Sequence, residues 1–253
     1  MHEIPMSEVT PEFVRCWQAA GVHIENSAGG ELDAWLRAHL NPPFLEHLSF
    51  RLGNQLFFIR LEDEEGRVVG PGSLQGLLSV ADRSNGHACI MPMRKRGGEW
   101  EAVLPGWGLK DAKTKKLINP PAEISDLQIE MTDWELQDFA VQIVRQQIEN
   151  EGYELMSWQS NPEVDPSLWF VGDEGPEWVI IKTARYPQED AELPNNLRTI
   201  AEKFSSMSKR GNFASVSVVC VHTMSEDGKL YRGYPLVTNY AGLQPISKMG
   251  RLG

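Results

Sequence analysis

Apolar and polar positions between residues 132 and 152 repeat with the period of an α-helix. The run "TDWE", Thr132 to Glu135, fits a capping box, in which the threonine oxygen accepts the Glu135 amide and the glutamate bonds back to the cap amide. Apolar residues then recur three or four positions apart as far as Ile148, and Gly152 offers a left-handed end. The pattern predicts one helix with a single buried face.

Three segments rich in strand-forming residues follow, namely "YELMSW" (153–158), "SLWFV" (167–171) and "EWVIIKTARY" (177–186). Short polar turns separate them. Residues 178–181 form an unbroken apolar run, and such runs are typical of an interior strand that is covered on both faces. We therefore expect three adjacent strands, with the third in the middle of a sheet.

A second helix and a last strand complete this half. Asn195 or Asn196 can cap the helix, and Gly211 is expected to end it. "FASVSVVCV" (213–221) predicts a core strand parallel to the third one, because a right-handed crossover through a helix usually returns in parallel. The predicted order is α-β-β-β-α-β. The apolar stripe of the helix is Leu197, Ile200, Ala201, Phe204 and Met207.

The first half shows a similar order. A helix is predicted over residues 31–40, where Asn41-Pro42-Pro43 ends it, and a hairpin of 48–52 and 55–63 follows. A helix within 72–86 and further strands come next. Two heptads, "LLSVADR" (77–83) and "LRTIAEK" (197–203), agree in size and charge pattern, which indicates a diverged tandem repeat; chance similarity between two amphipathic helices is the alternative.

These patterns predict an α/β protein with mixed α+β sheets. The expected domains are residues 1–125, an α/β unit and possible diverged repeat, and residues 126–240, the better-defined α-β-β-β-α-β unit. Residues 241–253 carry Gly, Lys and Ser and are expected to form a flexible tail.

Charge and composition narrow the classes of partner. The chain has 253 residues, 41% of them hydrophobic, and its net charge is −11 from 24 basic and 35 acidic side chains. This charge repels polyphosphates, so a protein partner or self-association is favoured over nucleic acid. The exception is the basic run from Arg94 to Lys116. No apolar stretch reaches a membrane span and no leader pattern opens the sequence, so we expect no membrane contact and a cytoplasmic location.

Cysteine and histidine spacing gives no metal motif. Cys16, Cys89 and Cys220 lie far apart and form no C-x-x-C pair, so buried reduced thiols are expected. The six histidines show neither H-x-x-x-H nor H-E-x-x-H spacing. No zinc site or disulfide framework is therefore predicted.

Residues 132–222 resemble the PD-(D/E)xK nuclease superfamily, the restriction-endonuclease-like fold. The resemblance rests on the α-β-β-β-α-β order, on Asp165 before the second strand and on Lys182 within the third. It implies that Asp165 binds Mg²⁺, that Lys182 orients the attacking water, and that Glu135 matches an extra acid of some members. The family's second acid lies two residues before the lysine, where this chain has Ile180. The motif is therefore degenerate.

Strand alternation limits how this acid could be replaced. Positions 178, 180 and 182 share a face, whereas Glu177 begins on the opposite one. A bulge after Pro176, or a carboxylate from Glu163 or Asp173, could still supply a ligand. The candidate catalytic residues are thus Asp165, Glu177 and Lys182, and the candidate metal ligands are Asp165, Glu177 and Glu163. Arg60 stands in the first half where Lys182 stands in the second, with no acid before it on its face.

Two functions follow, beside a purely structural role as a dimer held by exposed sheet or tryptophan surface, and the sequence leaves open whether the protein is an enzyme. The first is a catalytically degenerate nuclease-fold module for binding or regulation, which needs no cofactor. The alternative is an active Mg²⁺-dependent phosphodiesterase that uses Asp165, a relocated carboxylate and Lys182 on DNA or RNA. Each residue also has an ordinary structural explanation: Asp165 opens a turn before Pro166, and Lys182 ends a buried strand with its ammonium in water.

Overall fold

The structure, a computed structural model, describes residues 9–30, 32, 34–38, 48–220 and 229–248. It divides into two compact units, Met1–Ile129 and Glu130–Gly253, and the boundary lies four residues beyond the predicted one. Each unit is of mixed α/β class and contains one mixed sheet with few helices. Within the described part of the chain, every helix is too short or too polar to cross a lipid bilayer.

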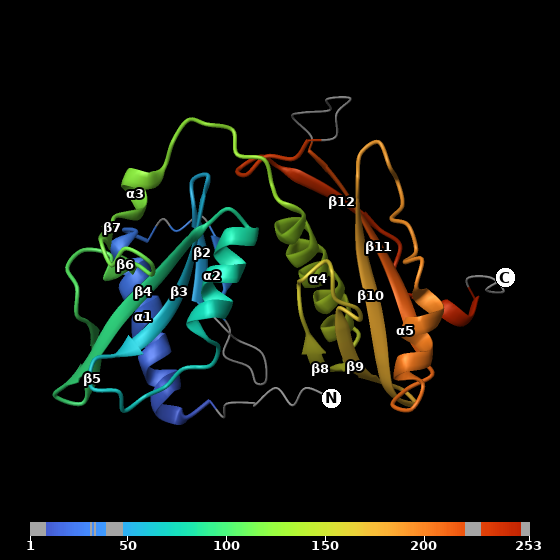
Figure 1. Cartoon of the computed structure of the whole chain (residues 1–253), viewed down its shortest axis with the longest axis horizontal. Helices are drawn as coiled ribbons and strands as arrows, with labels where there is room; N and C mark the ends of the chain where they lie inside the picture. Colours follow the sequence, from blue (N-terminus) through green and yellow to red (C-terminus); the bar gives the residue numbers. More distant parts are fainter. Residues whose placement is uncertain (1–8, 31, 33, 39–47, 221–228, 249–253) are drawn as a thin grey trace. The chain divides into compact units, whose positions relative to one another are not determined.

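The second unit begins with the predicted helix. Thr132 and Glu135 form both bonds of the capping box, and Gly152 has a φ of 87° just beyond the helix end. The elements of this unit are α4 (Asp133–Asn150), β8 (Glu154–Trp158), β9 (Leu168–Gly172), β10 (Gly175–Arg185), α5 (Leu197–Phe204), β11 (Gly211–Cys220), β12 (Leu236–Tyr240), β13 (Gln244–Pro245) and the 3-10 turn η1 (Ile246–Lys248) (Figure 1).

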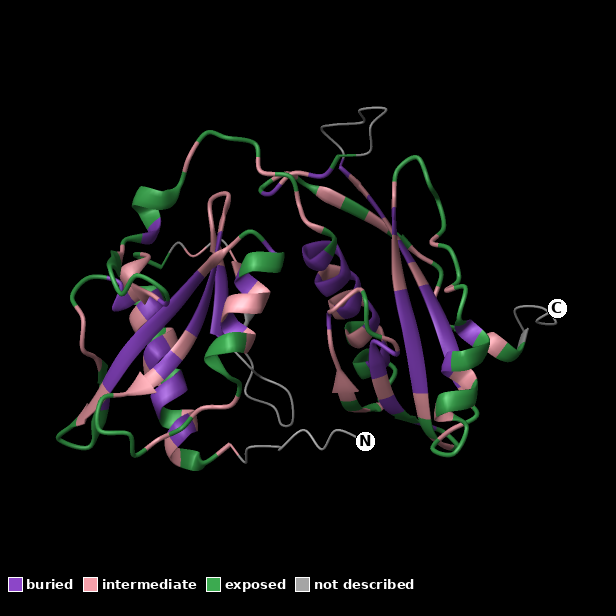
Figure 2. Ribbon diagram, in the orientation of Figure 1, coloured by how far each residue is buried: buried purple, intermediate pink, exposed green. Residues whose placement is uncertain are grey.

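Its sheet has the strand order β12-β11-β10-β9-β8, and β13 also pairs with β11. β10 and β11 are parallel as predicted, whereas β8, β9 and β10 pair antiparallel. Residues of β10 point alternately to two cores: Val179 and Ile181 pack with α4, and Trp178 and Ile180 pack with α5. All four are at most 1% exposed, which confirms an interior strand covered on both faces (Figure 2).

The first unit contains one sheet of order β1-β2-β3-β4-β6-β7, with β5 also paired to β4. Only β3 and β4 are parallel among its described pairs. The elements are α1 (Pro11–Ser27), β1 (Ala34–Arg37), β2 (Leu48–Leu52), β3 (Gln55–Asp63), α2 (Leu74–Arg83), β4 (His87–Arg96), β5 (Glu99–Ala102), β6 (Leu109–Asp111), β7 (Leu117–Ile118) and α3 (Pro120–Glu123).

The helix predicted over residues 31–40 is wrong. Within that range the structure has β1, which pairs antiparallel with β2, and the ring of Trp35 lies edge-on to Phe50 at 6.1 Å. The first helix is α1, which the sequence analysis missed. Thr10 caps it by accepting the amide of Phe13, and Pro11 opens its first turn. Because α1 covers this face of the sheet, residues 34–37 are not needed as a covering helix and pair with β2 as a strand.

Two smaller predictions in the second unit also need correction. Met207 is 60% exposed and does not belong to the apolar stripe, because α5 ends at Phe204, and Gly211 begins β11 rather than ending the helix. Residues 241–248 are not a free tail, since β13 pairs with β11 and Ile246 packs against the α5 core. Residues 249–253 lie outside the described part, as does Val221 at the end of the last predicted strand.

The two units share one connectivity over the described residues. Each has a helix, three antiparallel strands, a second helix, and a strand parallel to the third. Each then adds two short strands that pair with the two halves of that last strand: β5 and β6 on β4, β12 and β13 on β11. Matching Phe57 to Val179, which both pack under the first helix of their unit, places Arg60 at the position of Lys182.

Glu12 links α1 to the β4–β5 hairpin of the first unit. Its carboxylate accepts hydrogen bonds from Arg15, from Lys95 Nζ at 2.8 Å and from Trp100 Nε1 at 2.6 Å. These three donors, Arg15 first, lower the pKa of Glu12 from 4.5 to about 2. A depressed acid pKa stabilises the fold above the unfolded-state value, and this contribution is lost as the pH falls through the folded-state value.

We therefore expect Glu12→Gln to destabilise the first unit at neutral pH by an amount that shrinks as the pH falls from about 4.5 towards about 2. Urea unfolding of both proteins, followed at pH 7, 5, 4 and 3, measures this difference. A stability difference that is the same at every pH would show that the charge of Glu12 contributes nothing.

Candidate functional site

Lys182 lies towards the C-terminal end of β10, on the α5 face of the sheet. Its ammonium is 3.0 Å from Asp165 Oδ2 and donates to the carbonyl oxygen of Pro162 at 3.1 Å. The two charged side chains are 22% and 12% exposed. The structure therefore brings together the aspartate and the lysine that the sequence resemblance singled out, as a direct and largely buried ion pair.

The loop that carries Asp165 joins β8 to β9 and is held by side-chain amides. Gln159 Nε2 donates to the carbonyl oxygens of Val164 at 2.6 Å and Pro166 at 3.3 Å. Below the loop, buried Gln137 of α4 donates to Ser167 Oγ at 3.2 Å and to the Ile181 carbonyl at 2.8 Å. The bonds of buried Gln137 and of partly exposed Gln159 hold both ends of the segment from Val164 to Ser167, so they position Asp165 beside β10.

One oxygen of Asp165 is unusual. Oδ1 is shielded from solvent and has no hydrogen-bond partner in the structure, while Oδ2 contacts Lys182. A buried carboxylate oxygen without a partner is unfavourable. Asp165 thus retains one acceptor position that a donor or a cation could use.

The position expected to hold the second acid is closed. Ile180 is fully buried and packs against Trp178, Phe213 and the α5 residues Leu197 and Ile200. Its apolar side chain supplies no oxygen, and α5 covers the space around it.

The other candidate acids are placed elsewhere. Glu177 is cross-strand from Phe170 of the α4 core, and its carboxylate accepts from Asn212 Nδ2 at 2.8 Å. It therefore faces away from Lys182, as strand alternation predicts, and β10 pairs with β9 from Gly175 without a register shift. Asp173 accepts a hydrogen bond from the Tyr153 hydroxyl at 3.3 Å and raises the pKa of that tyrosine. Glu163 is an exposed residue of the β8–β9 loop.

Glu135 is also committed to another partner. It is buried in the first turn of α4, where Arg232 binds both of its oxygens, at 2.8 Å and 3.0 Å. Sequence reasoning explained Glu135 by the capping box and missed Arg232, which lies 97 residues away. An isolated arginine in a polar segment gives no local signal that it will be buried.

The residues present do not fit a magnesium site. Mg²⁺ prefers several hard oxygen ligands in octahedral geometry. Asp165 offers one, and Lys182 already occupies its other oxygen. Within the described residues, no group of three or more His, Cys, Asp or Glu side chains is arranged to hold a metal ion.

The basic run of the first unit is partly neutralised by its own acids. Arg94 contacts Glu101 at 2.7 Å, and this carboxylate raises the pKa of the arginine. Lys95 contacts Glu12, and Lys113 lies 3.0 Å from Asp82. These pairs weaken the case for a nucleic-acid surface over Arg94–Lys116.

The cysteines are free and buried as expected. Burial raises the pKa of Cys16 to about 12 and raises that of Cys89 as well, so neither is a reactive thiolate. The tryptophans near the candidate site are packing residues: Trp169 lies edge-on to Phe204 at 5.5 Å, and Arg145 stacks on Trp158 at 3.9 Å.

Part of the chain matches a known family model. Residues 134–246 match the model of a family described as Domain of unknown function (DUF8840). The DUF8840 match begins in the first turn of α4 and ends at η1, so it coincides with nearly all of the second unit. None of the curated proteins and none of the solved structures matches the chain.

Proposed function

We propose that the second unit is a restriction-endonuclease-like module that has lost metal-dependent hydrolysis and works in binding or regulation. The decisive observation is Ile180, a fully buried apolar residue at the position where the motif requires an acid. The order α4-β8-β9-β10-α5-β11, with β10 parallel to β11, supports the fold assignment. The first unit repeats this connectivity, which supports a diverged duplication of one ancestral unit.

In this proposal the Asp165–Lys182 pair has a structural role. It ties the β8–β9 loop to β10 through one ion pair and one carbonyl contact. A lysine that orients water in a nuclease must direct its ammonium at the reacting phosphate and its water, whereas Lys182 directs it at Asp165 and Pro162. The residues of the motif that remain thus support the loop.

The proposed partner is a protein. The net charge of −11 repels polynucleotides, and Arg94, Lys95 and Lys113 of the basic run of the first unit are paired with acids. The second unit also exposes large apolar side chains on its surface, among them Met156, Val171 and Met207. A protein partner or a second copy of the chain could cover such residues.

One observation favours the alternative of an active phosphodiesterase. The unpartnered Oδ1 of Asp165 lies on the same carboxyl group that binds Lys182, and this is the pair of residues a nuclease would keep. The alternative still needs a second carboxylate, which Glu163 or another acid would have to supply by movement of the loop.

Incubation with nucleic acid distinguishes the two functions. The full chain and Lys182→Ala are incubated with plasmid DNA, linear DNA and RNA in Mg²⁺ or Mn²⁺. We expect neither protein to cleave any substrate above the buffer control. Cleavage by the wild-type chain that Lys182→Ala abolishes would establish the phosphodiesterase and reject the proposal.

A further inference from the structure

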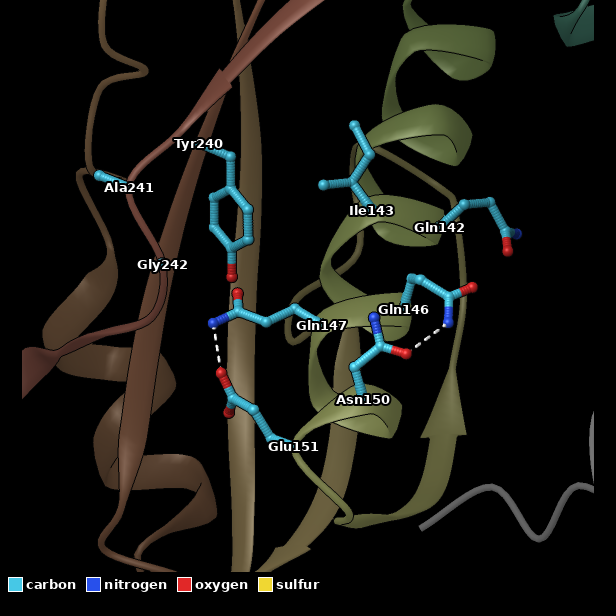
Figure 3. Close-up of a pocket in the computed structure, with 9 residues that line it drawn as sticks. All are labelled: Gln142, Ile143, Gln146, Gln147, Asn150, Glu151, Tyr240, Ala241 and Gly242. Atoms are coloured by element: carbon cyan, nitrogen blue, oxygen red, sulfur yellow. Dashed lines mark hydrogen bonds between the residues drawn. The ribbon is translucent and has the colours of Figure 1, made fainter.

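A groove on the second unit separates the C-terminal half of α4 from the link between β12 and β13 (Figure 3). Its volume is about 820 Å³. Four side-chain amides and the carboxylate of Glu151 line it, together with the phenol of Tyr240 and the apolar side chain of Ile143. The lining includes no lysine, arginine or histidine. It therefore suits an uncharged or basic ligand that both donates and accepts hydrogen bonds.

The first unit has a position that corresponds to this groove. The buried residues of α1 and α4, the first helix of each unit, show where it lies. The buried residues of α1 recur in α4 at a constant offset of 124 positions, and this offset places His23 at Gln147 and Ser27 at Glu151. Both pairs thus occupy the same face of their helix. The matched buried residues are Phe13, Cys16, Trp17, Ala20 and Ile24 in α1, and Gln137, Ala140, Val141, Val144 and Ile148 in α4.

In the first unit the chain fills this place with its own backbone. The link between β5 and β6, residues 103–108, turns onto α1, where the Gly106 carbonyl accepts from His23 Nε2 at 2.9 Å. Ser27 Oγ lies 3.4 Å from the same carbonyl and donates mainly to the His23 carbonyl at 2.8 Å. The next residue, Trp107, is only 7% exposed and stacks on Phe50 at 5.9 Å. A turn that carries one indole therefore closes the gap between the helix and the sheet.

In the second unit the corresponding link is short, and it begins with two small residues, Ala241 and Gly242, before Leu243 packs against the α4 core. It consists of residues 241–243, and Ala241 is exposed. Gln147 Nε2 donates to Glu151 at 2.6 Å, so these two helix residues bond to each other, whereas His23, the counterpart of Gln147, donates to a link carbonyl. The space between the first helix and the link is filled by the tryptophan turn in the first unit and is an open groove in the second unit.

Two wall atoms of the groove lack partners. Gln147 Oε1 and the Tyr240 hydroxyl are shielded from solvent without a hydrogen bond, and their side chains point towards each other in Figure 3. Burial raises the pKa of Tyr240, so the phenol stays protonated and can donate. A ligand backbone that enters between α4 and Tyr240 would supply the missing partners.

We propose that this groove binds a polypeptide turn of a partner protein, with one aromatic side chain inserted, a backbone N–H directed at Gln147 Oε1 and a backbone carbonyl directed at the Tyr240 hydroxyl. The tryptophan turn of the first unit shows how such a segment is held at the matching place of this fold. The absence of cations in the lining and the acidic chain select against acidic segments. This inference does not depend on whether the second unit descends from a nuclease.

The chain itself supplies the probe. A fluorescein-labelled peptide with the sequence of residues 102–109, AVLPGWGL, is titrated with the full chain and followed by fluorescence anisotropy. We expect saturable binding, weakened at least about tenfold when the peptide tryptophan is replaced by alanine, because a buried tryptophan usually dominates such contacts.

Two variants locate the site. Ala241→Trp places an indole at the groove mouth and is expected to abolish binding, while Gln147→Ala is expected to weaken it about tenfold. Gln188→Ala changes an exposed amide of the loop after β10 and is expected to bind as the wild type does. Circular dichroism and urea unfolding confirm that each variant is folded.

Some results would overturn the proposal. They are the absence of saturable binding, equal binding of the tryptophan and alanine peptides, or unchanged binding by folded Ala241→Trp. Preferential binding of an acidic peptide of the same length would reject the stated ligand chemistry. Nuclease activity of the chain would leave this result unaffected, so the two proposals fail separately.

Discussion

Arg232→Met is expected to destabilise the second unit by about 3–5 kcal/mol, the largest effect predicted for any substitution here. Arg232 and Glu135 form a two-point ion pair in which their side chains are 1% and 8% exposed. Methionine retains much of the volume of the arginine but leaves the carboxylate buried without its cation. Glu135 also accepts the backbone amide of Thr132 at 2.9 Å. A Glu135 carboxylate that has lost its arginine therefore also weakens the capping box at the start of α4.

Urea unfolding monitored by circular dichroism measures this loss, and an exposed pair provides the control. Arg198 and Glu202 lie 2.9 Å apart on α5 with side chains 76% and 66% exposed. Arg198→Met should therefore cost no more than about 0.5 kcal/mol. The double variant Glu135→Gln with Arg232→Met should be more stable than Arg232→Met alone, because it removes the unpaired charge. A cost below about 1 kcal/mol for Arg232→Met would show that this pair does not hold α4.

The second unit could be predicted largely from local patterns. The capping box at Thr132, the helical period after it and the apolar run at Trp178–Ile181 are short-range signals, and they gave the element order and the buried strand. The face of Glu177 followed from alternation alone. These features depend on residues that lie within a few positions of one another, so a single sequence contains the information.

Other features depend on residues far apart in the chain. Residues 34–37 form a strand because β2 is available to pair and α1 already covers the sheet, and neither fact is visible in the segment itself. Arg232 is buried because it pairs with the buried carboxylate of Glu135. The ion pair between Lys182 and Asp165 depends on a loop that Gln159 and Gln137 hold in place. The groove depends on the distance between α4 and the link after β12, which are about 90 residues apart in the chain, and no local pattern in either segment indicates it.

Gly211→Ala is expected to destabilise the second unit by about 1–3 kcal/mol. A Cβ at position 211 would lie 2.2 Å from Trp178 Cζ2, far inside the contact distance. The indole cannot withdraw, because it is 1% exposed and its N–H donates to the Ser208 carbonyl at 3.2 Å. Gly211 begins β11 directly beside Trp178, so the extra carbon would separate the two parallel strands at the centre of the sheet.

Two other glycines show that the clash with Trp178, and not the loss of a glycine, is responsible. Gly172→Ala would place its Cβ 2.4 Å from the Glu177 carboxylate, a flexible side-chain end that can rotate away, so its cost should be smaller. Gly21 lies inside α1, where an added methyl group would have no atom of another element within 4 Å, and Gly21→Ala should stabilise the first unit by about 0.5–1 kcal/mol. Thermal unfolding gives all three values. In the first unit, a Cβ at Gly86, just before β4, would likewise clash with Phe58 and Leu56. If Gly211→Ala costs no more than Gly172→Ala, the close contact at Gly211 does not limit side-chain size, and the same explanation for Gly86 fails.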